Sequence, residues 1–281
     1  MRDLGTPVLD NHLHLDAENR GIDAVTDFAR AGGTHLLVVN KPSWHVREGL
    51  PADRDDFRPV FEETIRLVSA ANSELRGRAW PVLGVHPALV SRLVDDADHT
   101  PAEARDLMQS GLEVAAEYAA NGVAVALKTG RPHYDVSDAV WDASNAVLRR
   151  GLELGAETGV AVQLHTEATE DLTDVAGWAE DVGLPPERVV KHYSSGELAG
   201  VTKSVMSQKD YLETAADLDE PFLMETDFID DADRPGAVMG PKTVPRRVDW
   251  LLENGHDDAV RRAHVETPEQ VYGIDTEETL H

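Results

Sequence analysis

Short apolar runs alternate along the chain with longer stretches in which apolar residues recur every three or four positions. The short runs predict strands, and the longer stretches predict amphipathic helices. Strands are expected at residues 7–14, 35–40, 79–86, 123–128, 160–165, 189–192, 201–206 and 222–227. Helices are expected at residues 21–31, 58–73, 101–120, 137–158, 171–182, 211–216 and 244–254. Strands that alternate with helices indicate a parallel sheet, and eight of them predict an α/β fold, a single (β/α)8 TIM barrel.

The length and composition suit one such barrel. The chain has 281 residues, against about 250 for a typical barrel. No internal repeat or linker interrupts it, so residues 1–281 are expected to form one domain. The absence of cysteine excludes disulfides, thiolate metal ligands and a cysteine nucleophile. No signal peptide and no run of about 18 apolar residues is present, which predicts a cytoplasmic protein with no membrane partner.

The charge balance is strongly acidic. Asp and Glu number 52 against 26 Lys plus Arg, so the formal net charge is -26. Such a surface suits molar salt, in which the Debye length shrinks to about 3 Å, and we expect a halophilic source. At low salt the same charge repels phosphate backbones, so no stable nucleic-acid complex is expected there.

Histidine and other polar residues recur where the predicted strands end. His12 and His14 lie two residues apart on the first strand, where alternation places both side chains on one face. The two imidazoles can therefore bind one cation. The later strands end at or near five further residues: His86, Lys128, His165, His192 and Asp227. The carboxyl ends of barrel strands build the active site. The pattern therefore predicts a metal site at the mouth of the barrel.

Several motifs in order along the chain resemble those of the TatD-related metal-dependent hydrolases, a branch of the amidohydrolase superfamily. They are DNHLHLD at 10–16, GVHP at 84–87, LHT at 164–166, HYSSG at 192–196, ETD at 225–227 and PEQVYG at 268–273. The resemblance implies a two-metal hydrolase, often a deoxyribonuclease or other phosphoesterase. It also implies one metal on His12, His14 and Asp227, a second on His165 and His192, and His86 near the substrate.

Two positions depart from the family pattern. Lys128 stands where these enzymes usually have a glutamate that bridges the metals. A carboxylated Lys128 would restore two bridging oxygens, whereas a free ammonium would repel the two cations. Glu167 stands where arginine is common, so it is expected to pair with Lys128 or to supply the missing carboxylate as an alternative metal ligand. The remaining alternative is that Lys128 is salt-bridged or solvent-facing and has no metal role.

Other polar residues near the strand ends are weaker candidates. Arg131 and His133 follow the fourth strand, and we expect them to bind substrate, with Arg131 neutralising a phosphate or carboxylate. Glu225 lies two residues before Asp227 and is expected deeper in the barrel, behind the ligands. His264 belongs to a surface pattern and is assigned no role.

These residues predict hydrolysis by a metal-activated water, with Asp227 as general base. One or two divalent ions are expected, with zinc preferred and magnesium or manganese as alternatives. The favoured hypothesis is a phosphoesterase or deoxyribonuclease that acts on a small-molecule or nucleic-acid phosphoester. The second is an ester, lactone or amide hydrolase with a carboxylated Lys128. The third is a non-catalytic barrel with a degraded metal site.

Overall fold

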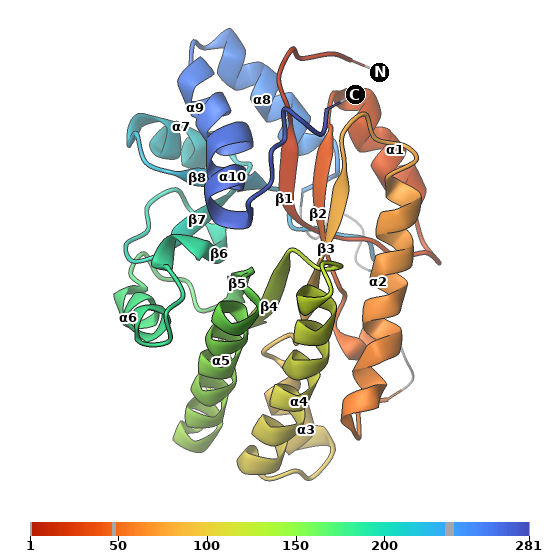
Figure 1. The fold of residues 1–281 in the computed structure, drawn as a ribbon, viewed down its shortest axis with the longest axis vertical. Coiled ribbons are helices and arrows are strands. Elements are labelled where there is room, and N and C mark those ends of the chain that lie inside the picture. The colour runs from red at the N-terminus through yellow and green to blue at the C-terminus, as the bar shows by residue number, and fades with distance from the viewer. Residues whose placement is uncertain (1, 47–48, 234–238, 281) are drawn as a thin grey trace.

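The predicted strands form one parallel sheet in the computed structural model, which describes residues 2–46, 49–233 and 239–280 (Figure 1). The sheet has the strand order β8-β7-β6-β5-β4-β3-β2-β1-β9. The strands are β1 (Leu9–His14), β2 (His35–Val39), β3 (Ala79–Gly84), β4 (Ala126–Gly130), β5 (Ala161–His165), β6 (Val189–Ser194), β7 (Thr202–Met206), β8 (Phe222–Glu225) and β9 (Phe228–Ile229).

The described residues thus hold nine parallel strands rather than the eight predicted, because the last predicted strand is interrupted. Strand β8 ends at Glu225, and Asp227 has a backbone φ of 46°, which a strand does not allow. The chain resumes as β9, where Phe228 and Ile229 pair with Leu13 and His14 of β1. Strands β8 and β9 are the two ends of the sheet, and both contact β1, so the curled sheet is consistent with a TIM barrel.

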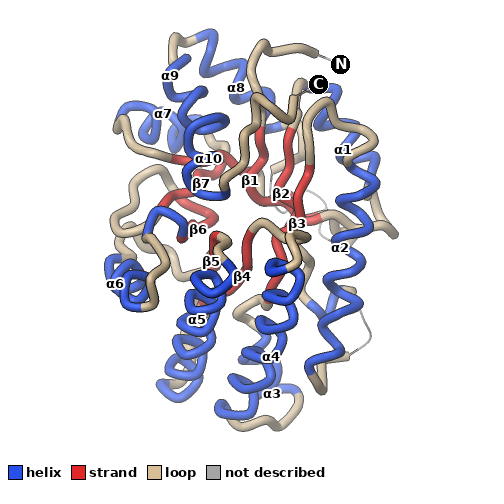
Figure 2. Tube along the Cα trace, in the orientation of Figure 1, coloured by secondary structure: helices blue, strands red, loops and turns tan. Residues whose placement is uncertain are grey.

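Helices cover the outside of the curled sheet (Figure 2). The longer ones are α1 (Ile22–Ala31), α2 (Arg58–Ala71), α4 (Pro101–Ala120), α5 (Asp138–Thr158) and α8 (Thr243–Glu253). The shorter ones are α3 (Leu89–Asp96), α6 (Thr173–Asp181), α7 (Lys209–Asp217), α9 (Asp257–Arg261) and α10 (Thr267–Tyr272). Helices α1 and α5 end at Gly32 and Gly159 with φ of 112° and 70°, conformations that favour glycine. Glycine at these two positions therefore ends both helices.

The strands also pack against one another on the inner face of the sheet. Buried apolar side chains from seven strands form one cluster together with Val271, Tyr272 and Ile274 near the end of the chain. Strands β3 and β4 approach closely, since a Cβ built on Gly84 would lie 1.9 Å from the carbonyl oxygen of Lys128. The apolar inner cluster supports the polar side chains next along the same strands.

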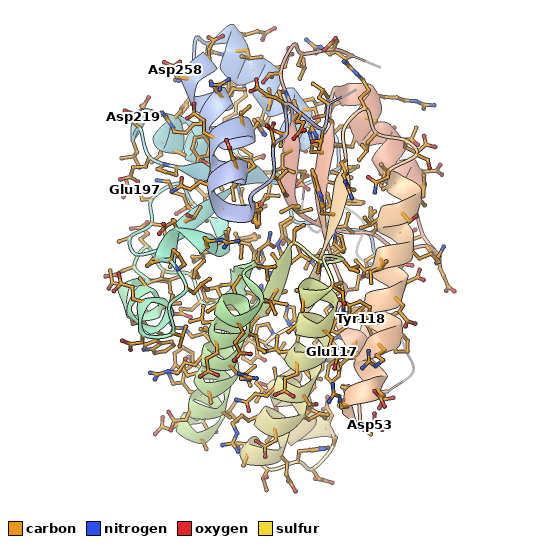
Figure 3. The ribbon with its side chains drawn as sticks, in the orientation of Figure 1. Asp53, Glu117, Tyr118, Glu197, Asp219 and Asp258 are labelled. Atoms are coloured by element: carbon orange, nitrogen blue, oxygen red, sulfur yellow. The ribbon has the colours of Figure 1, made fainter. Side chains whose placement is uncertain are left out.

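The outer surface carries the excess acidic charge. Figure 3 labels five exposed acidic residues on different elements, namely Asp53, Glu117, Glu197, Asp219 and Asp258. Among the residues that the structure describes, no helix is long and apolar enough to cross a bilayer.

Candidate metal centre

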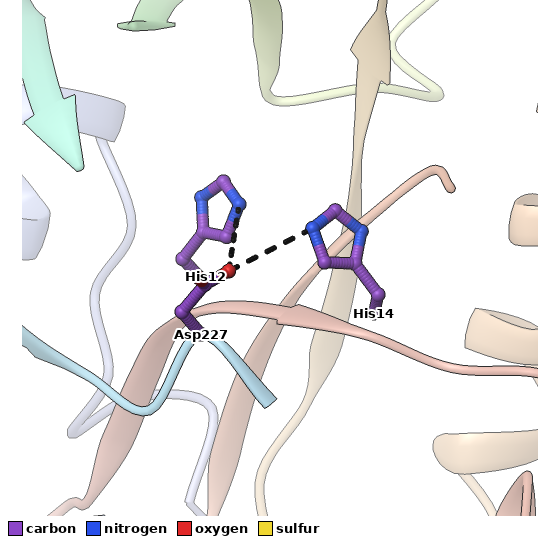
Figure 4. A group of neighbouring side chains, drawn as sticks. All are labelled: His12, His14 and Asp227. Atoms are coloured by element: carbon purple, nitrogen blue, oxygen red, sulfur yellow. Dashed lines mark ion pairs between the residues drawn. The ribbon is translucent and has the colours of Figure 1, made fainter. Parts of the chain in front are cut away.

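The structure brings His12, His14 and Asp227 together at the carboxyl end of β1 (Figure 4). The Nε2 atoms of both histidines lie 3.9 Å from Asp227 Oδ1. Two ligands that share a tetrahedral zinc at about 2.1 Å lie about 3.4 Å apart, so a small inward movement would suffice. Two imidazoles and a carboxylate are also a donor set that zinc and similar divalent ions accept. These three residues therefore fit a divalent metal.

A bulge in β1 explains why neighbouring residues both face the interior. The register with β2 shifts between Asp10 and Leu13. The Asn11 side chain donates a hydrogen bond to Ser204 across the interior. The side chain of the next residue, His12, is hydrogen-bonded to Gln163 in the same interior. Simple alternation therefore does not describe this strand.

Asp227 reaches the two histidines because the chain turns sharply after β8. Its φ of 46° lies in the left-handed region, which aspartate tolerates better than most residues. The Asp227 N–H donates to the His12 carbonyl at 3.0 Å, and Asp10 accepts from both the backbone and the hydroxyl of Thr226. Backbone and side-chain bonds to β1 thus aim the carboxylate at the imidazoles.

His165 and His192 lie beside this group. His165 Nδ1 is 2.7 Å from His192 Nε2, and the His192 ring stacks on His12 with centroids 4.1 Å apart. A second group of ligand atoms within 4.8 Å of one another comprises His12, His192 and Glu225. This second group includes His192 of β6, and His165 of β5 contacts it.

Burial keeps the imidazoles neutral, which is the form that binds metal. Desolvation, reinforced by the charge of Lys128, lowers the pKa of His14 to about 3 and the pKa of His12 and His192 well below the ordinary value. Desolvation also lowers the pKa of His165 strongly, with His86 as the next cause. All four imidazoles are therefore neutral at neutral pH, with one N–H each.

Lys128 lies at the centre of the site. Its side chain is buried, and Nζ lies 3.4 Å from His12 Nε2. Burial lowers the pKa of Lys128 to about 7, although Asp227 and Glu225 oppose the shift. The alternative of a solvent-facing lysine is therefore wrong, because this amine faces the ligand group.

The expected pairing of Lys128 with Glu167 is also wrong, because Glu167 lies against Arg131 instead. Arg131 Nε donates to both oxygens of Glu167, at 2.8 and 3.1 Å, and its Nη1 donates to Asp174 at 2.9 Å. The guanidinium also lies over Trp141 and is almost fully buried. Two carboxylates thus already occupy Arg131, and Glu167 belongs to neither ligand group found among the described residues.

His86 and His133 extend the row of histidines. The expected strand ends at Gly84, so His86 lies in the following loop, with its ring 4.8 Å from that of His165. Its Nδ1 accepts from the Ala88 N–H at 3.1 Å. His133 Nδ1 lies 2.8 Å from His165 Nε2. Both residues therefore lie next to His165, a predicted ligand of the second metal. Their expected contact with substrate stays a prediction.

A pocket of about 280 Å³ opens above these side chains. Its floor includes all six predicted metal ligands, His12, His14, Lys128, His165, His192 and Asp227. Its wall includes His86, Lys41, Trp44 and Arg92, and the Arg92 guanidinium lies 4.7 Å from the Trp44 ring centre. The predicted ligands thus face one small cavity.

Sequence reasoning missed two residues and misplaced a third. Gln163 is hydrogen-bonded to His12. The sequence could have indicated it, because Gln163 is the one amide in the otherwise apolar run before His165. Asp230 is fully buried and accepts from the backbone of the loop after β1, including the Gly21 N–H at 2.7 Å. His264, expected on the surface, is fully buried, and its Nδ1 accepts from the Leu9 N–H at 3.0 Å.

Comparison with known proteins agrees with the ordered motifs. Residues 9–273 match the family described as TatD related DNase. The chain belongs to this family. It is 34% identical over 284 residues to the uncharacterized protein MJ1127 of Methanocaldococcus jannaschii, covering 96% of this chain and 97% of that protein. This member of the TatD-related family is therefore a hydrolase with two groups of metal-binding residues.

The fold of this TatD-family chain is also similar to solved structures. A triple mutant of the organophosphorus hydrolase from Deinococcus radiodurans aligns with a TM-score of 0.60 at 16% identity, over 95% of this chain and 93% of that one. A lactonase from Listeria monocytogenes aligns with a TM-score of 0.59 at 14% identity, over 95% and 94%. The phosphotriesterase homology protein from Escherichia coli, complexed with phosphate in its active site, aligns with a TM-score of 0.60 at 13% identity, over 95% and 99%. At these identities the likeness concerns the fold alone.

Proposed function

We propose that the protein hydrolyses phosphoesters with the help of one or two divalent metal ions. The observation that carries the proposal is the group formed by His12, His14 and Asp227, whose ligand atoms face one another at the floor of a pocket. Two imidazoles beside a carboxylate are a metal-binding set, and the family is one of hydrolases.

His12, His14 and Asp227 would hold the first ion, while His165 and His192 would hold the second, with Lys128 between the two sets. A divalent ion, with zinc preferred and magnesium or manganese as alternatives, supplies a Lewis acid that acidifies a water molecule and polarises the scissile bond. Asp227 is the proposed general base. Its carboxylate accepts a proton from the water that attacks phosphorus and returns it to the oxygen that leaves.

Lys128 is proposed to act as a carbamate. Its amine would attack CO2, forming an N–C bond and losing one proton, and the product has two oxygens that suit two cations. The reaction needs an unprotonated amine, and burial lowers the pKa of Lys128 to about 7, so much of it is neutral near physiological pH. Nζ also lies 3.4 Å from His12 Nε2, so a carbamate formed on Lys128 would lie beside a predicted metal ligand.

The substrate is proposed to be a small phosphoester or the end of a nucleic-acid strand. A pocket of about 280 Å³ suits a small molecule, and a net charge of -26 opposes a long polyanion at low salt. Lys41 and Arg92 lie in the pocket wall, where Lys41 is paired with Asp16 at 2.6 Å and Arg92 with Asp96 at 3.7 Å. His86 and His133 would contact the substrate from beside His165.

A second candidate is the hydrolysis of a carboxylic ester, lactone or amide. The observation that favours it is Lys128, which replaces the usual bridging glutamate of the TatD enzymes. The same apparatus serves both reactions, because each needs an activated water and a polarised oxygen.

The test uses metal-depleted protein reloaded with zinc or manganese. Hydrolysis of bis(p-nitrophenyl) phosphate, p-nitrophenyl acetate, a γ-lactone and a single-stranded oligonucleotide is compared with that by Asp227→Asn. We expect the phosphodiester to be cleaved fastest, and only with metal. Faster cleavage of the acetate or lactone would favour the second candidate. Metal binding without hydrolysis of any substrate would favour a non-catalytic barrel.

The acidic surface supports the further proposal that the protein works in a salt-rich cytoplasm. Self-repulsion among exposed carboxylates opposes the compact state, and salt screens it. We expect the melting temperature to rise between dilute and molar KCl. A melting temperature that is indifferent to KCl would contradict this adaptation without touching the proposed chemistry.

A further inference from the structure

A chain of buried polar side chains begins at His12 and leads beneath the metal centre. His12 Nδ1 lies 2.8 Å from Gln163 Oε1. Gln163 Nε2 donates to the Tyr272 hydroxyl at 2.9 Å, and that hydroxyl donates to Asn11 Oδ1 at 2.8 Å. Tyr272 belongs to α10, so the last helix of the barrel reaches the inside of β1 and β5.

The chain continues across the interior towards the second half of the centre. Asn11 Nδ2 donates to Ser204 Oγ at 2.9 Å, and the Ser204 hydroxyl donates to the carboxylate of Glu225. Glu225 Oε1 accepts from the Tyr193 N–H at 2.7 Å and lies 3.4 Å from His192 Nδ1. This last contact lacks hydrogen-bond geometry, since His192 Nδ1 has no hydrogen-bond partner among the described residues.

The direction of the hydrogen bonds is fixed by groups that can only accept. Gln163 Nε2 also donates to the backbone carbonyl of Asn11, at 3.1 Å. This carbonyl cannot donate, so the amide nitrogen of Gln163 must face it and the amide oxygen must face His12. His12 Nδ1 is therefore the donor, and its Nε2 keeps a lone pair.

That lone pair faces the metal group. His12 Nε2 is the atom that lies 3.9 Å from Asp227 Oδ1 and 3.4 Å from Lys128 Nζ. A metal-binding histidine is commonly fixed in this way by an acceptor on its other ring nitrogen. Here the acceptor is an amide whose own orientation depends on further buried groups, all of them less than one tenth exposed.

We propose that Glu225, Ser204, Asn11, Tyr272 and Gln163 form a positioning relay that holds His12 in its Nδ1–H tautomer. The proposal rests on the proposed metal site, and it assigns the C-terminal helix α10 a part in metal binding through Tyr272. Ser204, Asn11, Tyr272 and Gln163 belong to neither group of ligand atoms found among the described residues, so they act through His12. Glu225, at the far end of the relay, belongs to the second group.

The test compares Gln163→Leu and Tyr272→Phe with wild type, and uses Tyr118→Phe as the matched control. Tyr118 lies on the outer helix α4 and donates to Glu62, so its hydroxyl is remote from the relay. The Kd for Mn²⁺ is measured by electron paramagnetic resonance, and the tautomer of His12 is measured by ¹⁵N NMR of the metal-free protein.

We expect Gln163→Leu to weaken Mn²⁺ binding about tenfold or more, as loss of a group behind a ligand does. Tyr272→Phe should weaken it about threefold, because it removes two neutral hydrogen bonds from a hydroxyl that reaches His12 only through Gln163. Both should reduce the Nδ1–H population of His12, and Tyr118→Phe should change neither quantity. If Gln163→Leu does not fold, Tyr272→Phe decides.

An unchanged Kd together with an unchanged His12 tautomer in Tyr272→Phe would overturn the relay. A wild-type protein that binds no Mn²⁺, while the variants still shift the His12 tautomer, would instead overturn the proposed function and leave the relay standing. The two failures are therefore distinguishable.

Discussion

The two halves of the metal centre hold their imidazoles in different ways, and the first half is organised in advance. His12 Nδ1 contacts Gln163 Oε1 at 2.8 Å, and His14 Nδ1 contacts the Val39 carbonyl at 2.9 Å. Each histidine is thus anchored at one nitrogen by an oxygen acceptor, while the other nitrogen faces Asp227. A cation can enter this half without rearranging the anchors.

The second half holds His165 between two other histidines, while His192 Nδ1 lies 3.4 Å from Glu225. His165 contacts His192 through Nδ1 at 2.7 Å and His133 through Nε2 at 2.8 Å. Both nitrogens of His165 are therefore engaged, and one contact must break before the residue can bind an ion. The difference teaches that the first half presents its donor atoms to an ion directly, whereas the second half must first give up contacts that its side chains already make.

The largest effect is expected from the first half. Replacing His12 and His14 together by alanine removes two of its three ligands, and activity should fall by on the order of 10³-fold. Elemental analysis should show loss of the first ion. Full metal content in this double variant would exclude the first half as the main site.

Substitutions of Lys128 should affect the second half and not the first, because this residue is proposed to bridge the two ions. Lys128→Ala should lose the second ion, keep the first and lose on the order of 10²-fold in activity. Lys128→Glu should restore the bridge usual in the family and retain both ions. Two ions per chain in the alanine variant would mean that this position does not bridge.

Acid should destabilise the metal-free protein through its buried histidines. Burial lowers the pKa of His14 and His86 to about 3, so the unfolded chain binds protons on these residues below pH 6.5 while the folded protein does not. Stability of the metal-free protein should therefore be lost as pH falls from 6.5 towards 3. Burial of Asp10 acts in the opposite direction, since it raises the pKa of that carboxyl to about 7.

Urea unfolding of the metal-free protein at several pH values measures this dependence, and His86→Gln isolates one contribution. We expect the slope of unfolding free energy against pH to become shallower in that variant below pH 6.5. An identical slope would show that His86 titrates normally in the folded state.

The smallest effect on metal content is expected from Glu167. Its carboxylate is committed to Arg131, so Glu167→Gln should leave metal stoichiometry unchanged. The nearly buried guanidinium would retain Asp174 only, and stability should fall by about 1 to 3 kcal/mol. Loss of an ion in this variant would instead assign the missing carboxylate to Glu167.

The sequence predicted the parallel sheet and the convergence of the strand ends well, because both follow from periodicity and chain direction. It failed where one residue changes local geometry. The bulge after Asp10 and the turn at Asp227 break the alternation of their strands, and no residue type announces either feature. The family resemblance, rather than periodicity, pointed to Asp227 as a ligand of the first ion.

Long-range partners were the other failure. Glu167 was expected to pair with Lys128 or to supply the missing carboxylate, yet its carboxylate accepts hydrogen bonds from Arg131 instead. Gln163 and Tyr272 meet across 109 residues, a contact that strand and helix patterns do not encode. Such pairings depend on side-chain reach inside the folded barrel, which only the three-dimensional structure supplies.

The break between β8 and β9 has a consequence for how the protein folds. Asp10 and Thr226, which are 216 residues apart in sequence, are hydrogen-bonded at the seam where the sheet closes on itself. Contacts of such high sequence separation are costly in loop-closure entropy and form late. Because Asp227 joins His12 and His14 at this same seam, a chain that has not wound completely lacks this group of three side chains.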